Sequence, residues 1–436
     1  MRLGAPGADY ARAVSPVRPT LLVVGHRHEP EDHRLRDFLT RIAQPFEWLE
    51  AESAEGQQML ADRGLAGAAL PVVIDGDQYV DAATVERLAA AWRGDAPPSR
   101  REYDLVIVGA GPAGLAAAVY AASDGLSTLL LDRDVPGGQA SHTSLIENFF
   151  GFPDGIGGAE LARLAGRQAE GFGAELAFLR GVTGSERRSG GGFSLTLEGD
   201  FEVEARVAIA APGMVWRRLD VEGIEELMDR GVYYGAGRSE AAHCGDEDVV
   251  VVGAGNSAGQ AVLNLVGAGA RVTMLVRGDQ LGKSMSAYLV NRIVEHPLID
   301  VRLRTEIEAV AADGGRLAGV TVRNGDGRTE DVPAQSLFLC LGGEPRTGWA
   351  LEAGIATDPR GYILTGPDLL DTGRRPKGWP LARDPLTLET SAPGLFVAGD
   401  ARHGSTKRVA GAVGEGAMAA ALVHRRLEEL DGSAPL

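Results

Sequence analysis

A strand-like run, Tyr103-Asp104-Leu105-Val106-Ile107-Val108, leads directly into a glycine-rich turn, Gly109-Ala110-Gly111-Pro112-Ala113-Gly114. An alanine-rich stretch with helical character follows the turn. The glycines of such a turn let the backbone approach a pyrophosphate closely, and the N-terminus of the following helix meets its negative charge. One turn of this kind is only weak support for a nucleotide site, so the rest of the chain decides the interpretation.

A second unit of the same kind occurs later in the chain. The run Val249-Val250-Val251-Val252 enters Gly253-Ala254-Gly255-Asn256-Ser257-Ala258-Gly259, and another helical stretch follows. Two such units predict an α/β fold with two Rossmann-like nucleotide-binding domains. We expect cofactor contacts from residues of both turns, namely Gly109, Gly111, Pro112, Ala113, Gly114, Gly253, Gly255, Asn256, Ser257 and Ala258.

The residue that ends the next strand of each unit distinguishes the two nucleotides. The first strand ends at Asp132, whose carboxylate accepts hydrogen bonds from ribose hydroxyls and repels a 2′-phosphate, as suits the ADP half of FAD or NAD. The second ends at Arg277, with Lys283 nearby, and a guanidinium binds a 2′-phosphate by charge-assisted contacts. The alternative for Arg277 is an ordinary solvated arginine. Together the two sites predict FAD and NADPH as cofactors.

Composition narrows the class of protein. The 436 residues suffice for about three domains, and a net charge of −17 disfavours nucleic acid or an anionic membrane as a partner. No apolar run approaches the roughly 20 residues that cross a bilayer. Two cysteines cannot form a disulfide framework and indicate a reducing, cytoplasmic location. Residues 1–18 are expected to be a disordered lead and not a secretory signal.

From about residue 103 onward the chain resembles the low-molecular-weight thioredoxin reductases. Besides the two turns, the resemblance rests on Gly137-Gly138-Gln139, Glu147-Asn148, Thr390-Ser391 and the run Pro393-Gly394-Leu395-Phe396-Val397-Ala398-Gly399-Asp400. It implies an FAD domain, residues 103–222 and 344–436, that is interrupted by an NADPH domain at residues 223–343. It also implies a homodimer.

The resemblance implies further cofactor contacts. Gly399 would approach the FAD diphosphate, Asp400 would bind the ribityl chain, and Arg408 would lie near the flavin ring. Pro212 stands where the family usually has threonine. The remaining residues assigned to the FAD site in this way are Gly138, Gln139, Asn148, Gly213, Val409 and Ala410.

The family carries a Cys-x-x-Cys pair at a fixed distance before the second turn. Counted back from Gly253, the pair falls on Ala236-Gly237-Arg238-Ser239, which contains no cysteine. Thiol–disulfide exchange needs an attacking and a resolving thiol, so the usual relay from flavin to dithiol cannot run here. Cys244, beside His243, is an alternative redox residue. Cys340 lies in an apolar run and is predicted to be part of the core.

Residues 19–95 are predicted to form a separate domain, joined by a linker at residues 96–102. Their pattern follows the order β-α-β-α-β-β-α and resembles the thioredoxin/glutaredoxin fold, in which the proline matching Pro71 is cis. The loop at residues 26–33, where a glutaredoxin places its cysteines, holds three histidines and three acids but no thiol. We interpret the domain as a docking surface and predict no metal. A divalent metal at this loop is the alternative.

These features together predict an NADPH-dependent FAD oxidoreductase. Electrons would pass from reduced flavin directly to a small molecule or a redox protein, with Arg408 and Asn148 as catalytic candidates. Arg408 is suited to stabilise negative charge on reduced flavin or on the acceptor. One alternative is a nucleotide- or redox-responsive binding protein with little turnover. Another is a thioredoxin-disulfide reductase that acts through Cys244.

Overall fold

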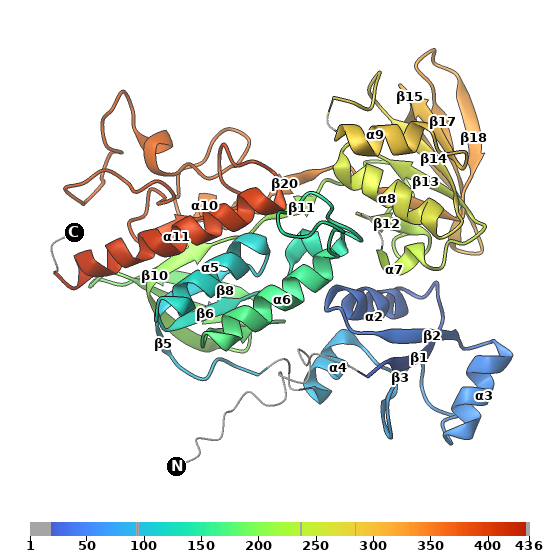
Figure 1. Ribbon diagram of the computed structural model, residues 1–436, viewed down its shortest axis with the longest axis horizontal. Helices are drawn as coiled ribbons and strands as arrows, with labels where there is room; N and C mark the ends of the chain where they lie inside the picture. Colours follow the sequence, from blue (N-terminus) through green and yellow to red (C-terminus); the bar gives the residue numbers. More distant parts are fainter. Residues whose placement is uncertain (1–18, 93, 95, 236–237, 284, 433–436) are drawn as a thin grey trace.

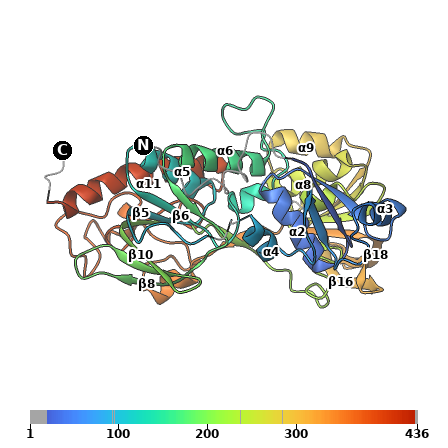
Figure 2. The same ribbon diagram turned by 90° about the horizontal axis from the view of Figure 1, so that it is seen from below.

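The computed structural model describes residues 19–92, 94, 96–235, 238–283 and 285–432 and shows three bodies (Figure 1). The N-terminal body lies beside the inserted body and also reaches the body that carries both ends of the remaining chain (Figures 1 and 2). The predicted disordered lead at residues 1–18 lies outside the described residues, as do Ala236 and Gly237 of the expected dithiol position. No helix among the described residues is long and apolar enough to span a bilayer.

The N-terminal body is a four-stranded sheet in the order β2-β1-β3-β4. Its first two strands are parallel, and its third and fourth strands continue the sheet in antiparallel pairing. The order of elements agrees with the predicted pattern, and the Leu70–Pro71 peptide bond is cis. The elements are β1 (Leu21–Gly25), α2 (Pro30–Arg41), β2 (Phe46–Glu50), α3 (Ala54–Asp62), β3 (Val72–Asp75), β4 (Gln78–Val80) and α4 (Val85–Ala91).

The first glycine-rich turn belongs to a mixed sheet that the chain leaves and later rejoins. β5 (Glu102–Val108) lies between β6 (Thr128–Leu131) and β10 (Phe201–Ala210), and β21 (Leu395–Val397) returns to pair with β10. The other elements of this body are α5 (Pro112–Ser123), η1 (Gly138–His142), α6 (Gly158–Gly171), β7 (Glu175–Ala177), β8 (Val182–Arg187), β9 (Phe193–Leu197), α10 (Gly348–Glu352), η2 (Gly366–Leu369) and α11 (Val409–Leu430). In this sheet β10, β9 and β8 pair antiparallel, and the other strands pair parallel.

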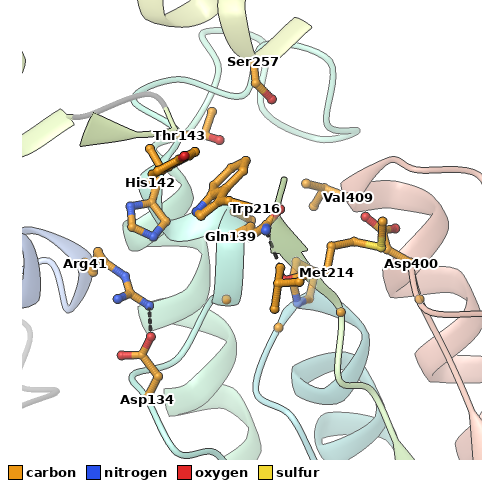
Figure 3. Close-up of a pocket in the computed structure, with 18 of the residues that line it drawn as sticks. Arg41, Asp134, Gln139, His142, Thr143, Met214, Trp216, Ser257, Asp400 and Val409 are labelled. Carbon is orange, nitrogen blue, oxygen red and sulfur yellow. Dashed lines mark hydrogen bonds and ion pairs between the residues drawn. The ribbon is translucent and has the colours of Figure 1, made fainter. Parts of the chain in front are cut away.

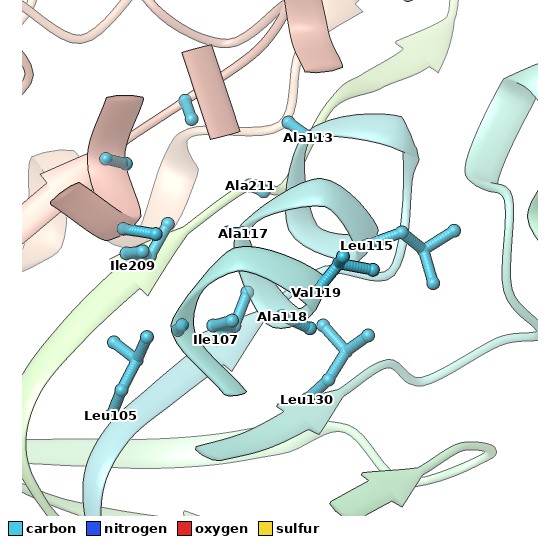
Figure 4. Packing of buried hydrophobic residues seen from close by; sticks show 14 of the residues in the cluster. Leu105, Ile107, Ala113, Leu115, Ala117, Ala118, Val119, Leu130, Ile209 and Ala211 are labelled. Carbon is cyan, nitrogen blue, oxygen red and sulfur yellow. The ribbon is translucent and has the colours of Figure 1, made fainter. Parts of the chain in front are cut away.

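Helix α5 packs on the centre of this sheet because its inward face is small and apolar. Leu115 and Val119 of α5 belong to the same buried cluster as Ile107, Leu130 and Ile209 of the sheet (Figure 4). The alanines of α5 allow a close approach, and α11 packs on its other side. The start of α5 is thereby fixed at the carboxyl edge of β5, where open α/β sheets bind their ligands.

The inserted body is a second parallel sheet, in the order β12-β19-β13-β14-β15. Two short antiparallel strands, β11 (Met214–Trp216) and β20 (Gly343–Pro345), connect it to the first sheet. The remaining elements are β12 (Val232–Tyr234), α7 (Arg238–Ala241), β13 (Asp248–Val252), α8 (Asn256–Gly267), β14 (Arg271–Val276), α9 (Ala287–Val294), β15 (Ile299–Leu303), β16 (Glu306–Asp313), β17 (Arg316–Arg323), β18 (Thr329–Pro333) and β19 (Ser336–Leu339).

The return segment at residues 337–345 is divided between two sheets. Its first part is β19, which pairs with β12 and β13 inside the inserted body, and its last part is the connecting strand β20. Gly342 adopts a φ of +77° between them, a conformation that glycine tolerates without a steric penalty. The chain therefore turns out of the inserted sheet before it reaches the connection.

Candidate active site

A cavity of about 1010 Å³ lies where the three bodies meet (Figure 3). The N-terminus of α5, the helix η1, strand β11 and the N-terminus of α11 contribute to its wall. The N-terminus of α8 faces the same space from the inserted body, and α2 reaches it from the N-terminal body. Both glycine-rich units thus open onto one cavity.

The middle residues of the first glycine-rich turn face the cavity, and its first and last glycines pack against other backbone atoms. Gly111 is the N-cap of α5, and a Cβ built there would meet nothing within 4 Å. Pro112 and Ala113 also line the cavity. Gly109 has a φ of +107°, and a Cβ there would lie 2.2 Å from the carbonyl oxygen of Ala211. Gly114 and Gly109 therefore shape the turn, whereas Gly111 leaves room for a phosphate group.

Asp132 lies at the end of β6 on the cavity wall, as predicted. Its Oδ2 accepts a hydrogen bond from the backbone N–H of Ala110 at 2.6 Å, and its Oδ1 accepts one from Asp134 at 3.0 Å. Burial raises the pKa of this carboxyl, while these two donors oppose the shift. Each oxygen keeps a lone pair for a ribose hydroxyl.

The segment that precedes α11 forms another part of the wall. Gly399, Asp400, Arg408 and Val409 line the cavity, with Arg408 as the N-cap of α11. Burial raises the pKa of the Asp400 carboxyl, and the positive charge of Lys407 opposes that shift. These four residues were predicted to contact FAD. Ala410, the fifth C-terminal residue of that prediction, does not line the cavity.

Helix η1 and the chain beside it supply the rest of the predicted FAD contacts. Gly138, Gln139, Asn148 and Gly213 all line the cavity. Gln139 donates a hydrogen bond from Nε2 to the carbonyl oxygen of Met214 at 3.1 Å, which ties η1 to β11 (Figure 3). This hydrogen bond holds η1 against β11, the strand that leads into the inserted body.

The second turn repeats the geometry of the first. Gly255 is the N-cap of α8, and a Cβ there would meet nothing within 4 Å, while Asn256 and Ser257 line the cavity. Gly253 instead packs against the chain, since its Cβ would lie 2.4 Å from the carbonyl oxygen of Cys340. Ala258 is buried. The middle of each turn is open and its ends are packed.

The inserted body is held over the first sheet by contacts with one loop. Gln260 of α8 donates from Nε2 to the carbonyl oxygen of Leu145 at 3.1 Å, and Arg292 of α9 forms an ion pair with Glu147 at 3.3 Å. These contacts place the N-terminus of α8 on the side of the cavity opposite α5.

The predicted 2′-phosphate ligands lie away from the cavity. Arg277 directly follows β14 and is exposed. Lys283 forms an ion pair with Asp279 at 2.9 Å, so part of its charge is already neutralised. The two cations are near each other in sequence, but neither belongs to the cavity lining.

Neither cysteine of the chain lines the described cavity. Cys244 is fully buried, its Sγ lies 3.3 Å from the carbonyl oxygen of Glu240, and burial raises the pKa of its thiol to about 12. Cys340 is buried, as predicted, and burial raises its pKa to about 12 as well. A thiolate is the reactive form of cysteine, so both thiols are poorly placed for disulfide exchange. Ser239, at the second expected dithiol position, is buried and lines the cavity.

Histidines of the loop at residues 26–33 in the N-terminal body form ion pairs. His26 lies 2.8 Å from Glu52, and His33 lies 2.9 Å from Asp229 of the inserted body. Across the described part of the chain, no group of three or more His, Cys, Asp or Glu side chains is arranged to hold a metal ion.

Several cavity residues have no motif that would reveal them in the sequence. His33, Asp37 and Arg41 come from α2, while His142 and Trp216 come from the first body and its connection. They meet only because separate bodies are packed together, and no local pattern signals such contacts.

The features of the cavity fit both dinucleotides. The N-termini of α5 and α8, each with an open glycine at the N-cap, suit two pyrophosphates. The carboxylates of Asp132 and Asp400 provide acceptors for sugar and ribityl hydroxyls. FAD would therefore lie along α5 and α11, and a nicotinamide nucleotide would approach along α8.

Known proteins support this assignment. The family described as "Pyridine nucleotide-disulphide oxidoreductase" matches residues 103–416. A thioredoxin reductase of Listeria monocytogenes is 33% identical over 335 residues, which are 76% of this chain and 96% of that protein. The crystal structure of Lactococcus lactis thioredoxin reductase in its FR conformation aligns with a TM-score of 0.66 at 31% identity, over 75% of this chain and 99% of that one. The thioredoxin reductase of T. acidophilum aligns with the same TM-score at 28% identity, over 75% of this chain and 99% of that one.

The matches cover the two nucleotide-binding bodies and nearly the whole length of each relative. The protein therefore belongs to the pyridine nucleotide-disulphide oxidoreductase family and is an FAD-dependent NAD(P)H oxidoreductase of the thioredoxin reductase type.

Proposed function

We propose that the protein transfers electrons from NADPH to FAD and then directly to an acceptor, without a dithiol relay. One observation carries this proposal: both nucleotide turns open onto one cavity, and neither cysteine lines it in the described structure. A nicotinamide positioned by α8 could reach a flavin positioned by α5 and α11 in this arrangement of the bodies. The acceptor would then be a small molecule or a redox protein.

The protein's own residues perform the positioning and the electrostatics. When bound, the flavin supplies the capacity to take a hydride from the nicotinamide and to pass electrons on. The N-terminus of α5 would hold the FAD pyrophosphate, and Asp400 would orient the ribityl chain. Arg408, at the N-cap of α11, would stabilise negative charge that develops near the ring. Asn148 is the other predicted catalytic residue on the wall.

The N-terminal body supports a docking role. Its sheet order and its element order favour a thioredoxin-like domain, and its loop at residues 26–33 contains no thiol. Arg36 of α2 and Glu240 of α7 form an ion pair at 3.0 Å in which both side chains are fully buried. We infer that this body is held against α7 and serves as a redox-inactive docking domain, and that the protein is a cytoplasmic homodimer.

Anaerobic titration with NADPH tests the proposal. The flavin absorption band should bleach rapidly, and full reduction should consume one equivalent of NADPH because only the flavin stores electrons. A requirement for two equivalents would reveal a second redox centre and contradict the absence of a relay. An unbleached band would contradict electron transfer altogether.

A second candidate function is a nucleotide-responsive binding protein with little turnover. The contacts of α2 with both other bodies favour it, because occupancy of the cavity could change how α2 is held. Slow or absent bleaching by NADPH, with intact nucleotide binding, would support this alternative. The remaining alternative, disulfide reduction through Cys244, requires loss of turnover in Cys244→Ser, which the burial of this thiol makes unexpected.

A further inference from the structure

Helix α2 of the N-terminal body completes the wall of the cavity. His33, Asp37 and Arg41 follow one another at intervals of four residues, so they lie on one face of α2, and all three line the cavity. The cavity is therefore shared by the N-terminal body and the two nucleotide-binding bodies.

His142 faces α2 from the other side. It is the last residue of η1, the short helix that begins with the predicted FAD contacts Gly138 and Gln139. Its Nδ1 lies 3.5 Å from Oδ1 of Asp37, and its ring meets the ring of Trp216 edge to face with centroids 6.3 Å apart. Figure 3 shows the imidazole beside Trp216, on the side of the cavity where Arg41 lies.

Asp37 is itself held in place by a network that crosses the boundary between bodies. Arg41 lies 3.5 Å from Asp37 and forms an ion pair with Asp134 at 2.7 Å. Its Nε also donates a hydrogen bond to Ser141 Oγ at 3.1 Å. Arg41 thus ties α2 to the residue that precedes His142, and the imidazole and the carboxylate are positioned by the same contacts.

The charges around the pair keep Asp37 ionised. Burial opposes ionisation, but the positive charges of His142, Arg41 and His33 outweigh it and hold the pKa of Asp37 well below its ordinary value. An ionised carboxylate beside one ring nitrogen fixes the orientation of an imidazole. The other charged groups that face this part of the cavity are Asp134, Arg217, Arg218 and Asp229.

We propose that His142, oriented by Asp37, is the proton donor for reduction of the acceptor, and that the acceptor is a carbonyl compound of the quinone class. This inference rests on the proposed function. The positioning residue Asp37 belongs to the N-terminal body, so the docking domain completes the catalytic site. Trp216 gives the site a flat apolar wall suited to a planar ring.

The chemistry selects this acceptor class over a disulfide. Reduction of a disulfide by exchange needs an attacking thiolate, and neither cysteine reaches the described cavity. A quinone needs no covalent intermediate with the protein. It gains two electrons and one proton as a hydride from the reduced cofactor and a second proton from the His142 imidazolium. The imidazole is left neutral and takes up a proton from solvent, and the cofactor returns to its oxidised form.

One measurement tests the pair without turnover. Histidine C2–H resonances of the oxidised protein are followed by NMR from pH 5 to 9, and His142→Gln assigns the resonance of His142. In Asp37→Asn the His142 resonance should move, because the carboxylate 3.5 Å from its Nδ1 is lost. In Asp37→Glu it should return toward the parent position. An unmoved resonance in Asp37→Asn would overturn the positioning role.

The second measurement separates the two half-reactions by stopped-flow absorbance, with 1,4-benzoquinone as the acceptor. In His142→Gln, reduction of the flavin by NADPH should proceed at the parent rate, whereas reoxidation by the quinone should slow by about 10²- to 10⁴-fold. In Asp37→Asn reoxidation should also slow, because the imidazole loses the carboxylate that orients it, while reduction by NADPH should proceed at the parent rate. Asp37→Glu should restore part of the reoxidation rate.

His424→Gln is the matched control. His424 pairs with Asp124 at 3.4 Å, at the far ends of α11 and α5, and does not line the cavity. It should leave both half-reactions unchanged. If the flavin of the parent is not reduced by NADPH, the proposed function fails, while the NMR titration still decides whether Asp37 and His142 are coupled. If the parent is reduced and reoxidised normally and His142→Gln behaves like it, the proton donor lies elsewhere and this inference fails.

Discussion

Asp400 shows how a single carboxylate can be tested as a cofactor ligand. It lies on the cavity wall, and burial raises its pKa. If it binds the ribityl hydroxyls, Asp400→Ala should weaken FAD binding by about 1.5–3 kcal/mol, the value of a hydrogen bond to a charged group. Flavin content after dialysis, measured by absorbance, checks this expectation. Full retention of flavin would contradict the assignment of Asp400.

Arg277 carries the predicted preference for NADPH. Arg277 directly follows β14 and is exposed. We expect it to contact the 2′-phosphate and not the pyrophosphate, so its removal should affect binding of NADPH and not of NADH. Arg277→Ala should raise the KM for NADPH and leave the KM for NADH nearly unchanged. Lys283→Ala should have a smaller effect, because Lys283 is already paired with Asp279. A parent enzyme that uses both nucleotides equally well would refute the preference.

Glu170 gives the protein a pH-dependent weakness. This residue near the end of α6 is largely buried, and burial raises the pKa of its carboxyl to about 7, although Arg167 opposes the shift. A carboxyl whose folded-state pKa is raised costs stability as the pH rises from its unfolded value of about 4.5 toward 7. Glu170→Gln should therefore raise the melting temperature at pH 8 and not at pH 4.5. Equal gains at both pH values would show that ionisation is not the cause.

At the scale of elements, α2 and α7 are joined by a buried ion pair. Arg36 reaches Glu240 through Nε at 3.2 Å and Nη2 at 3.0 Å, and its guanidinium lies 4.4 Å from the ring centroid of Trp48. Arg36→Met leaves the buried carboxylate of Glu240 with only the more distant His33, whose Nε2 lies 3.7 Å away, and should cost about 3–5 kcal/mol. The double variant Arg36→Met/Glu240→Leu should recover most of that loss.

Denaturant unfolding followed by tryptophan fluorescence measures these differences. The exposed pair of Arg34 and Glu31, 2.9 Å apart on the same helix, provides the control. Arg34→Met should change stability by about 1 kcal/mol or less, as exposed pairs do. A double variant that is as unstable as Arg36→Met alone would assign the loss to packing of the arginine stem and not to the charge.

The elements that bind nucleotides were predictable because their signals are local. The turn at residues 109–114 contains the strand end, the glycines and the start of α5 within a few positions, and the turn at residues 253–259 repeats this for α8. The order of elements in the N-terminal body was also readable from alternating apolar patterns. The contacts of Asp37 with His142 and of Arg36 with Glu240 were not, because they join residues that are far apart in sequence and lack any shared motif.

At the scale of the whole molecule, α2 is the place where the three bodies are joined. It contacts the first body through Arg41 and Asp134, and the inserted body through Arg36 and Glu240. A rotation of the inserted body relative to the first one cannot preserve both sets of contacts. A domain movement of the hinge kind would therefore require α2 to separate from one of its two partners.

The buried pair and the network around Arg41 also determine how the chain responds to proteolysis. Residues 96–102 connect the N-terminal body covalently, but the contacts of α2 hold it in place independently of that connection. A protease cut within these residues should leave the N-terminal fragment associated with the rest of the protein during gel filtration, and mild denaturant should release it. Such a nicked complex would consist of two complementary fragments. They would stay bound to each other through the contacts of α2 and would not need the intact linker.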